Sequence, residues 1–323
     1  MPTRREFLRR SAAAAAAASL PSLLGRDPLA FAGIDRKEAL AKPLALRDLG
    51  RTGIRVSCLG LGCYYLGNLA DEEKAVAVVK RAAELGVNWF DTAPSYGPRT
   101  GVSEDRVGRA LRGLRDRVRI ATKSTCRDGA GALKDLEGSL RRLGTDRVDL
   151  FQFHALKDPG DVKGTFGEKG AFEALEKARR DGKVLHLGFS GHFDPDLVAG
   201  VCRERSLETV LMPLNALDPH QRSFEKGALP AAREKGMGVI AMKVFVSGRL
   251  VSDPALSPTA AECLRYALSL PVSTAIVGCS TVEELETDLA LAKTFAPMDA
   301  KEREALLERT RPFVAKDIEW YKR

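Results

Sequence analysis

Short runs of apolar residues alternate with longer amphipathic segments along most of this chain. Each run is rich in Val, Ile, Leu or Phe and has few polar positions, as expected for a parallel strand that is buried on both faces. We therefore predict eight strands, at residues 56–60, 87–91, 119–123, 148–154, 184–190, 209–213, 238–243 and 273–278.

The segments between these runs have apolar residues three and four positions apart, which is the spacing of an amphipathic helix. In residues 71–85, for example, Ala75, Val78, Val79 and Ala82 share one helical face. Glycine lies just past several of these segments, which is typical of a helix end. The predicted helices are residues 71–85, 103–111, 133–143, 171–181, 195–205, 227–235, 259–270 and 281–293.

The repeated strand-then-helix order predicts an α/β fold, a closed (β/α)8 TIM barrel with a parallel sheet inside a ring of helices. The alternative is an open doubly wound sheet, which usually has G-x-G-x-x-G after its first strand. Gly60, Gly62 and Gly67 do not have that spacing. Residues 44–49 and 54–57 flank a turn bounded by glycines and predict an N-terminal β-hairpin at the bottom of the barrel.

The two ends of the chain lie outside this repeat. Residues 301–323 predict a C-terminal helix with a loose end beside the barrel mouth. At the other end, Arg4 and Arg5 precede an alanine-rich apolar run, an order that resembles a twin-arginine export signal. The resemblance implies a signal peptide at residues 1–32, a barrel domain at residues 33–323, and a periplasmic or exported location reached through the twin-arginine export machinery.

Composition narrows the classes of function further. The N-terminal apolar run is too short and alanine-rich for a stable membrane span, and a disordered or helical arm is the alternative to a signal. The formal net charge is +8, but no basic stretch is interleaved with aromatic residues, so nucleic acid binding is not expected. The six cysteines lack metal-ligand spacing, so we expect no metal and mostly buried free thiols, with Cys63 and Cys126 as the alternative disulfide pair.

Ionisable residues stand at the ends of three neighbouring predicted strands. Asp91 ends one strand, and Tyr96 lies in the loop after it. Lys123 ends the next strand, and His154 ends the third. The carboxyl ends of parallel strands meet at one mouth of a barrel, where barrel enzymes have their active sites. A lysine among apolar strand residues needs a partner, which Asp91 would supply.

These groups suit the reduction of a carbonyl compound. A carbonyl group that accepts a hydride develops negative charge on oxygen and needs a proton, which Tyr96 can supply. We expect the Lys123 ammonium to lower the pKa of the phenol from its usual value of about 10. Asp91 would orient this ammonium, and His154 would hydrogen-bond the carbonyl oxygen of the substrate.

The surrounding residues resemble the motifs of the aldo-keto reductases. Four segments match in the family's order, namely FDTAPSYG at 90–97, IATK at 120–123, DLFQFH at 149–154 and GKVLHLGFS at 182–190. The resemblance implies hydride transfer between a nicotinamide cofactor and a small carbonyl substrate, with a catalytic tetrad of Asp91, Tyr96, Lys123 and His154. The alternative is a barrel whose polar strand ends only satisfy one another, and burying four ionisable groups for structure alone is costly.

The same resemblance implies residues that hold the cofactor. Ser190 matches a serine at the nicotinamide amide, and Asn215 matches an asparagine after the sixth strand. Lys243 and the loop with Gly248 and Arg249 fall beside the pyrophosphate. The chain departs from the family on its sixth and seventh strands, where the usual glutamine and the aromatic residue that stacks on the nicotinamide are not in their expected places.

The end of the eighth strand bears on which cofactor is used. Gly278 and Ser280 precede a helix N-terminus, which can offer N–H groups to a phosphate, although Ser280 and Glu283 also match a capping box that needs no ligand. The family often has an arginine for the 2′-phosphate where this chain has Glu284, and an asparagine at the adenine where it has Asp288. The resemblance therefore implies NADP(H), and the Glu284 carboxylate keeps NAD(H) open.

Three hypotheses of function follow. The first is an NAD(P)H-dependent oxidoreductase that reduces aldehydes or ketones reversibly, with Tyr96 as general acid and base. The second is a non-catalytic nicotinamide-binding barrel that acts as a sensor or partner subunit. The third is a barrel lyase or isomerase that uses the same four residues for proton chemistry. Consumption of the cofactor would separate the first hypothesis from the third.

Overall fold

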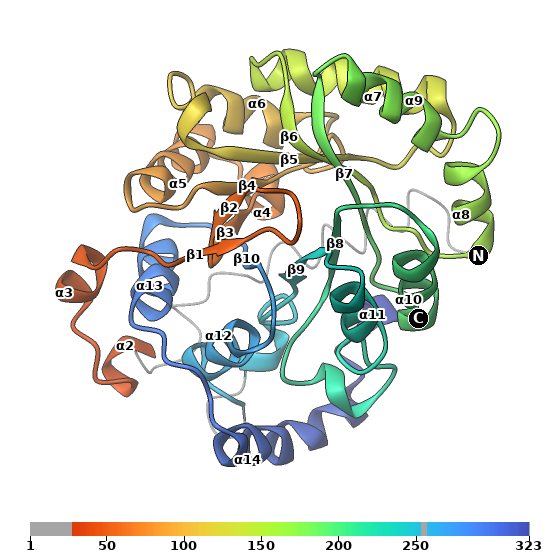
Figure 1. Cartoon of the computed structure of the whole chain (residues 1–323). Coiled ribbons are helices and arrows are strands. Elements are labelled where there is room, and N and C mark those ends of the chain that lie inside the picture. The colour runs from red at the N-terminus through yellow and green to blue at the C-terminus, as the bar shows by residue number, and fades with distance from the viewer. Residues whose placement is uncertain (1–27, 253–256, 323) are drawn as a thin grey trace.

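A computed structural model of the chain describes residues 28–252 and 257–322. Eight parallel strands close into a barrel in the order β10-β3-β4-β5-β6-β7-β8-β9, with helices around it (Figure 1). The predicted (β/α)8 fold is therefore confirmed. The barrel strands are β3 (Leu59–Gly62), β4 (Trp89–Asp91), β5 (Arg119–Ser124), β6 (Val148–Phe153), β7 (Val184–Ser190), β8 (Thr209–Pro213), β9 (Gly238–Met242) and β10 (Thr274–Val277).

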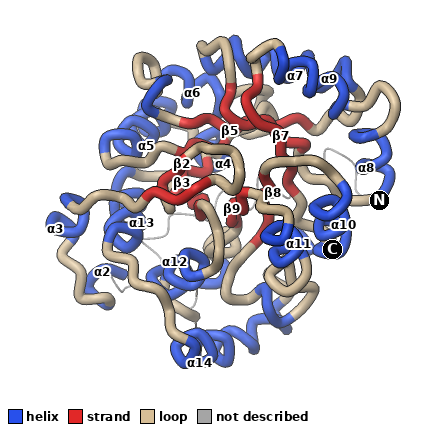
Figure 2. Tube along the Cα trace, in the orientation of Figure 1, coloured by secondary structure: helices blue, strands red, loops and turns tan. Residues whose placement is uncertain are grey.

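The helices lie outside the strands, as the tube in Figure 2 shows. Their caps follow from the sequence: the side chains of Asp71 and Asp128 each accept a backbone N–H in the first turn, and Gly144 ends one helix with a φ of 64°. The helices around the barrel are α5 (Glu72–Glu84), α6 (Val102–Ala110), α7 (Gly129–Leu143), α8 (Pro159–Phe166), α9 (Ala171–Arg180), α10 (Pro195–Glu204), α11 (Ala228–Glu234), α12 (Ala260–Ser269) and α13 (Val282–Lys293).

The predicted hairpin is confirmed, but the predicted first barrel strand is misplaced. Strands β1 (Leu46–Asp48) and β2 (Arg55–Ser57) pair antiparallel below the barrel. The apolar run at residues 56–60 spans the end of β2 and the start of β3, and hydrophobicity alone does not mark the boundary between two consecutive strands. Gly50 brings the hairpin turn so close to the barrel that a Cβ would lie 2.2 Å from the Gly238 nitrogen.

A short N-terminal segment packs on the outside of the barrel. The helices α2 (Pro28–Phe31) and α3 (Arg36–Ala41) lie against α13, and the Leu29 side chain is only 2% exposed. These residues include the end of the predicted signal peptide, so the boundary at residue 32 stays a prediction. Residues 1–27, which carry the rest of that prediction, lie outside the described residues. No helix in the described ranges is both long and apolar enough to cross a membrane.

The C-terminal tail packs at the barrel mouth, as predicted, but its end is well packed rather than loose. After α14 (Ala300–Thr310), two 3-10 helices follow, η4 (Arg311–Lys316) and η5 (Trp320–Lys322). The side chains of Tyr321 and Lys322 are buried. All six cysteines are free thiols, and all except Cys126 are buried, which confirms the expected free thiols.

Candidate active site

The ionisable residues predicted at the strand ends come together at the barrel mouth. Lys123 on β5 donates from Nζ to Asp91 Oδ1 at 2.5 Å and to the Thr92 carbonyl at 2.8 Å. Gln152 on β6 donates to the other Asp91 oxygen at 3.1 Å. Both charged side chains are buried, so the ammonium and the carboxylate depend on each other rather than on water.

Tyr96 lies beside this ion pair, in the loop after β4. Lys123 Nζ is 4.9 Å from the centre of the Tyr96 ring, and the His154 ring centre is 5.9 Å from it in an edge-to-face contact. A Cβ on Gly67 would lie 2.4 Å from the Tyr96 carbonyl oxygen, and Gly97 has a φ of 130°. Glycine at both positions therefore lets the loop bring the phenol close to Lys123.

Buried polar side chains hold this loop against the strands. Thr92 Oγ1 donates to Ser103 Oγ at 2.8 Å, and Ser103 Oγ donates to the Cys63 carbonyl at 2.9 Å. The buried Glu104 carboxylate accepts a bond from Thr122 Oγ1 at 2.5 Å. These bonds satisfy groups that cannot reach water, so Ser103 and Glu104 help to fix the geometry around Tyr96.

Tyr96 keeps its proton in these surroundings. Burial raises the pKa of Tyr96 to about 12, although the Lys123 ammonium acts in the opposite direction. The Lys123 ammonium does lower the pKa of Tyr96, as expected, but the loss of water on burial outweighs this effect, so the pKa lies above its usual value rather than below it. Burial alone would also lower the pKa of Lys123, but Asp91 and Tyr96 together raise it and keep the ammonium charged.

His154 follows β6 and remains neutral. Its pKa is held well below the usual range, since burial and the Lys123 charge both disfavour the imidazolium. Its backbone N–H donates to the Ser124 carbonyl at 2.8 Å, while no described residue hydrogen-bonds to its ring. Tyr64 packs edge-on against Tyr96 at 5.3 Å and forms a wall of the site. The neutral imidazole can therefore bond a carbonyl oxygen beside the phenol.

Two cations lie after β9, on another side of the mouth. Lys243 follows β9, and Arg249 begins the short helix η3 (Arg249–Val251) after Gly248, whose φ is 80°. Within the described ranges neither side chain has an acidic partner, and both lie against aromatic rings. Burial lowers the pKa of Lys243 to about 8. Positive charge without a neutralising carboxylate fits an anion such as a pyrophosphate.

Ser190 and Asn215 differ in how well they fit a role in cofactor binding. Ser190 ends β7 at the mouth, and its Oγ accepts a bond from the Ala155 N–H at 2.8 Å. Asn215 is fully buried, and its Oδ1 accepts bonds from the N–H groups of Leu217 at 2.9 Å and Asp218 at 3.1 Å. The predicted contact of Asn215 with the cofactor stays a prediction, and the side chain already shapes the turn after β8.

The end of β10 carries negative rather than positive charge. Glu284 is buried, and its carboxylate accepts a bond from the Ser280 N–H at 2.6 Å, where an anionic ligand would bind a helix N-terminus. Burial, reinforced by the Glu284 charge, raises the pKa of the neighbouring Asp288 to about 7. A Cβ on Gly278 would lie 2.4 Å from Tyr65, so this glycine makes room for that ring. The helix cap is Thr281, which is not the predicted pair of Ser280 and Glu283.

Sequence reasoning gave no site role to Gln152, Trp320 or Tyr321. Gln152 is a polar residue between Phe151 and Phe153 on a buried strand, and that interruption was a usable signal. The two aromatic residues lie more than seventy positions after Lys243, which their rings contact, and no local pattern predicts such a contact.

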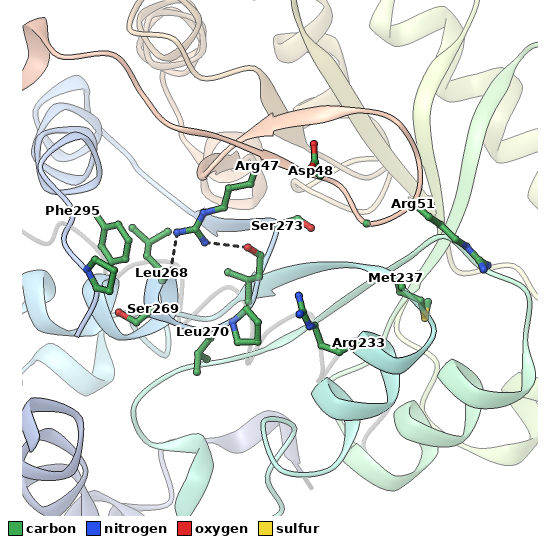
Figure 3. Close-up of a pocket in the computed structure, with 15 residues that line it drawn as sticks. Arg47, Asp48, Arg51, Arg233, Met237, Leu268, Ser269, Leu270, Ser273 and Phe295 are labelled. Carbon is green, nitrogen blue, oxygen red and sulfur yellow. Dashed lines mark hydrogen bonds between the residues drawn. The ribbon is translucent and has the colours of Figure 1, made fainter. Parts of the chain in front are cut away.

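A separate pocket of about 700 Å³ lies at the opposite end of the barrel (Figure 3). It is lined by Arg47 and Arg51 of the hairpin and by Met237 and Ser273, which precede β9 and β10. The Arg47 guanidinium donates to backbone carbonyls there, including that of Val272 at 3.0 Å. This pocket is therefore part of the barrel bottom and is distinct from the site around Tyr96.

Comparison with known proteins shows what this arrangement resembles. A family model described as "Aldo/keto reductase family" matches residues 58–262. "Uncharacterized oxidoreductase YrpG" of Bacillus subtilis (strain 168) is 34% identical over 223 residues, which are 62% of this chain and 67% of that protein. "L-galactose dehydrogenase" of Arabidopsis thaliana is 28% identical over 298 residues, which are 76% of this chain and 88% of that protein.

Solved structures agree with the sequence comparison. The holo form of aldo-keto reductase AKR11C1 from Bacillus halodurans superimposes with a TM-score of 0.70 at 26% identity, covering 82% of this chain and 96% of that one. The putative aldo-keto reductase PA4992 from Pseudomonas aeruginosa gives a TM-score of 0.65 at 27% identity, covering 80% of this chain and 98% of that one. Both likenesses extend over the barrel as a whole.

Proposed function

Because this chain belongs to the aldo/keto reductase family and is an NAD(P)H-dependent oxidoreductase that reduces carbonyl compounds, we propose that its catalytic groups are those gathered around Tyr96. The observation that carries this proposal is the buried Lys123–Asp91 ion pair beneath the Tyr96 ring, with the neutral His154 ring beside it. A merely structural barrel would have little reason to bury four ionisable groups at one mouth.

Each residue contributes a distinct step to carbonyl reduction. A bound nicotinamide cofactor supplies the hydride. His154 orients the substrate by bonding its carbonyl oxygen, and Tyr96 donates the proton to that oxygen as negative charge develops there. The Lys123 ammonium stabilises the phenolate that Tyr96 leaves behind, and Asp91 keeps the ammonium in place. Since burial raises the pKa of Tyr96 to about 12, the phenol carries its proton at neutral pH and can donate it.

Two dinucleotides are candidates for the cofactor, and the charged residues of the site distinguish between them. The family resemblance favours NADP(H), and Lys243 with Arg249 would hold the pyrophosphate of either dinucleotide. At the end of β10, however, Glu284 and Asp288 are both buried carboxylates. A 2′-phosphate beside them would meet like charge, whereas a ribose hydroxyl would find hydrogen-bond acceptors. The two buried carboxylates therefore favour NAD(H), which is the other candidate cofactor.

A fluorescence titration of the full chain with NADH and with NADPH tests the cofactor assignment. Tight binding of either dinucleotide supports the reductase proposal, and tighter binding of NADH would identify the two carboxylates as the selective element. Absence of binding at submillimolar concentrations of both would overturn the proposal. A separate activity assay should measure the turnover of a panel of aldehydes and ketones. It should also measure the oxidation of L-galactose, because one relative is named L-galactose dehydrogenase.

We also propose that the protein is exported in a folded state with its cofactor bound. The support is the sequence pattern of Arg4 and Arg5 before an apolar run, which resembles a twin-arginine signal. Since free nicotinamide cofactors are scarce outside the cytoplasm, export of the loaded enzyme would supply one. Cell fractionation should find the wild type in the periplasm with cofactor, and Arg4→Lys with Arg5→Lys should retain it in the cytoplasm. Equal distribution of the two proteins would reject this idea.

A further inference from the structure

The last residues of the described chain lie across the barrel mouth. We call residues 319–322 the C-terminal strap. The backbone of Lys322 lies beside Arg222 in the loop after β8, and its carbonyl accepts a bond from that guanidinium. The strap thereby closes the mouth on the β8–β9 side, which is separate from the Tyr96 loop on the β4 side.

A buried polar cluster anchors the strap. Lys322 Nζ pairs with Asp218 Oδ1 at 2.8 Å and with Glu319 Oε1 at 2.9 Å, and it also donates to the Gln221 carbonyl at 3.0 Å. The side chains of Lys322 and both carboxylates are almost fully buried. Because a buried ammonium with two carboxylates is costly to separate, the strap is held in one place rather than acting as a mobile lid.

Tyr321 joins the strap to the strands. Its hydroxyl donates to Glu319 Oε1 at 2.8 Å and accepts a bond from Asn215 Nδ2 at 3.1 Å. Its ring also packs edge-on against His192, with the ring centres 6.5 Å apart. The amide of Asn215 therefore connects the turn after β8 to the strap. These bonds give partners to a polar side chain that is buried.

The aromatic rings of the strap lie against the two cations at the mouth. Lys243 Nζ is 4.9 Å from the centre of the Tyr321 ring and 5.5 Å from that of Trp320. The guanidinium carbon of Arg249 is 4.6 Å from the Trp320 ring centre. An aromatic face attracts a cation through its quadrupole but carries no net negative charge. The strap can thus restrain both cations while leaving their positive charge available to an anion.

We propose that Trp320 and Tyr321 are positioning residues that hold Lys243 and Arg249 in place for the anionic pyrophosphate of the cofactor. This inference rests on the proposed function, because it requires that a dinucleotide binds at this mouth. A carboxylate in place of either ring would also restrain the cations, but it would neutralise them and repel the phosphates. The aromatic strap therefore combines restraint of the cations with retention of their charge.

The test compares Trp320→Leu with Trp320→Phe and the wild type in the full chain. The leucine variant should bind NADH and the probe ADP about tenfold more weakly, since both cation–π contacts are lost, and the phenylalanine variant should recover most of the affinity. The Michaelis constant for the cofactor should rise while kcat stays the same, because Tyr96 and Lys123 are untouched. Thermal unfolding of each variant verifies that the fold is kept.

Lys316→Met is the matched control, because it removes a contact of the same kind at an exposed site of the tail, where Lys316 lies 4.6 Å from the Phe313 ring centre. This control should bind as the wild type does. If the wild type binds and Trp320→Leu binds equally well, the positioning role is overturned and the proposed function stands. If the wild type binds neither NADH nor NADPH, the proposed function fails and the positioning role fails with it.

Discussion

At the scale of single residues, burial outweighs neighbouring charge at Tyr96 and Lys243, whereas at Lys123 the neighbouring groups outweigh burial. The pKa of Tyr96 is raised to about 12 by burial, although the Lys123 ammonium lies against its ring. The pKa of Lys243 is lowered to about 8 by the same cause. A sequence shows which charged residues are neighbours, but the extent of water exclusion depends on the whole packed mouth.

The titration of Lys243 predicts how cofactor affinity depends on pH. Below pH 8 the amine is charged and attracts phosphate, and above it the free protein loses that charge, so the dissociation constant for NADH should rise with pH. Lys243→Met should bind more weakly below pH 8 and show a smaller pH dependence. Lys243→Arg, which keeps the charge, should abolish the rise near pH 8. A wild-type affinity that is constant across this range would contradict the role of Lys243.

The Glu284 carboxylate predicts how the two dinucleotides are distinguished. Glu284→Gln removes a buried negative charge with little change of shape, so the affinity for NADPH should increase about tenfold relative to NADH. Competition binding of the two dinucleotides measures this ratio. Glu283→Gln is the control, since Glu283 is the exposed neighbour on the same helix turn. An unchanged ratio in Glu284→Gln would mean that the 2′-position lies elsewhere.

At the scale of secondary structure elements, the alternation of apolar and amphipathic segments was sufficient to predict the barrel, but it did not predict the helix α8 or the C-terminal strap. The strands β7 and β8 have the predicted bounds, since one apolar run ends at Ser190 and the other ends at Pro213. The helix α8 was missed because its short segment has little helical periodicity, although Asp158 before Pro159 is a helix-start signal. The strap was unpredictable because its position depends on contacts far along the chain.

The packing of helix α2 predicts a contribution to stability from the N-terminal segment. Leu29→Ala should lower the free energy of unfolding by about 2 kcal/mol, because the Leu29 side chain is buried against the barrel. Ala30→Ser at the exposed neighbouring position should change it little. Urea unfolding of the full chain measures both. Equal stability of Leu29→Ala and the wild type would show that the packing of α2 does not stabilise the fold. Cleavage of the predicted signal peptide after Ala32 would then leave the stability of the barrel unchanged.

At the scale of the whole molecule, the barrel separates three regions with different chemistry. The tetrad lies at the β4–β6 side of the mouth, the cations Lys243 and Arg249 follow β9, and the buried carboxylates follow β10. The hairpin closes the opposite end. The sequence predicted that the four residues of the tetrad would meet, because Asp91, Lys123 and His154 lie at or next to strand ends and Tyr96 lies in the loop after one of them. The cofactor residues stay predictions, and the bond from Asn215 to Tyr321 in the tail could not be predicted because the two residues are far apart in the sequence.

Tyr96→Phe removes the hydroxyl that we propose donates the proton during NAD(P)H-dependent carbonyl reduction. The measurement is the rate of NADH and NADPH oxidation with a panel of aldehydes and ketones, together with the dissociation constant of the cofactor for the same preparations. In Tyr96→Phe, kcat should fall about 100-fold or more while cofactor binding is unchanged. A Tyr96→Phe variant that reduces carbonyl compounds at the wild-type rate would contradict this role of Tyr96.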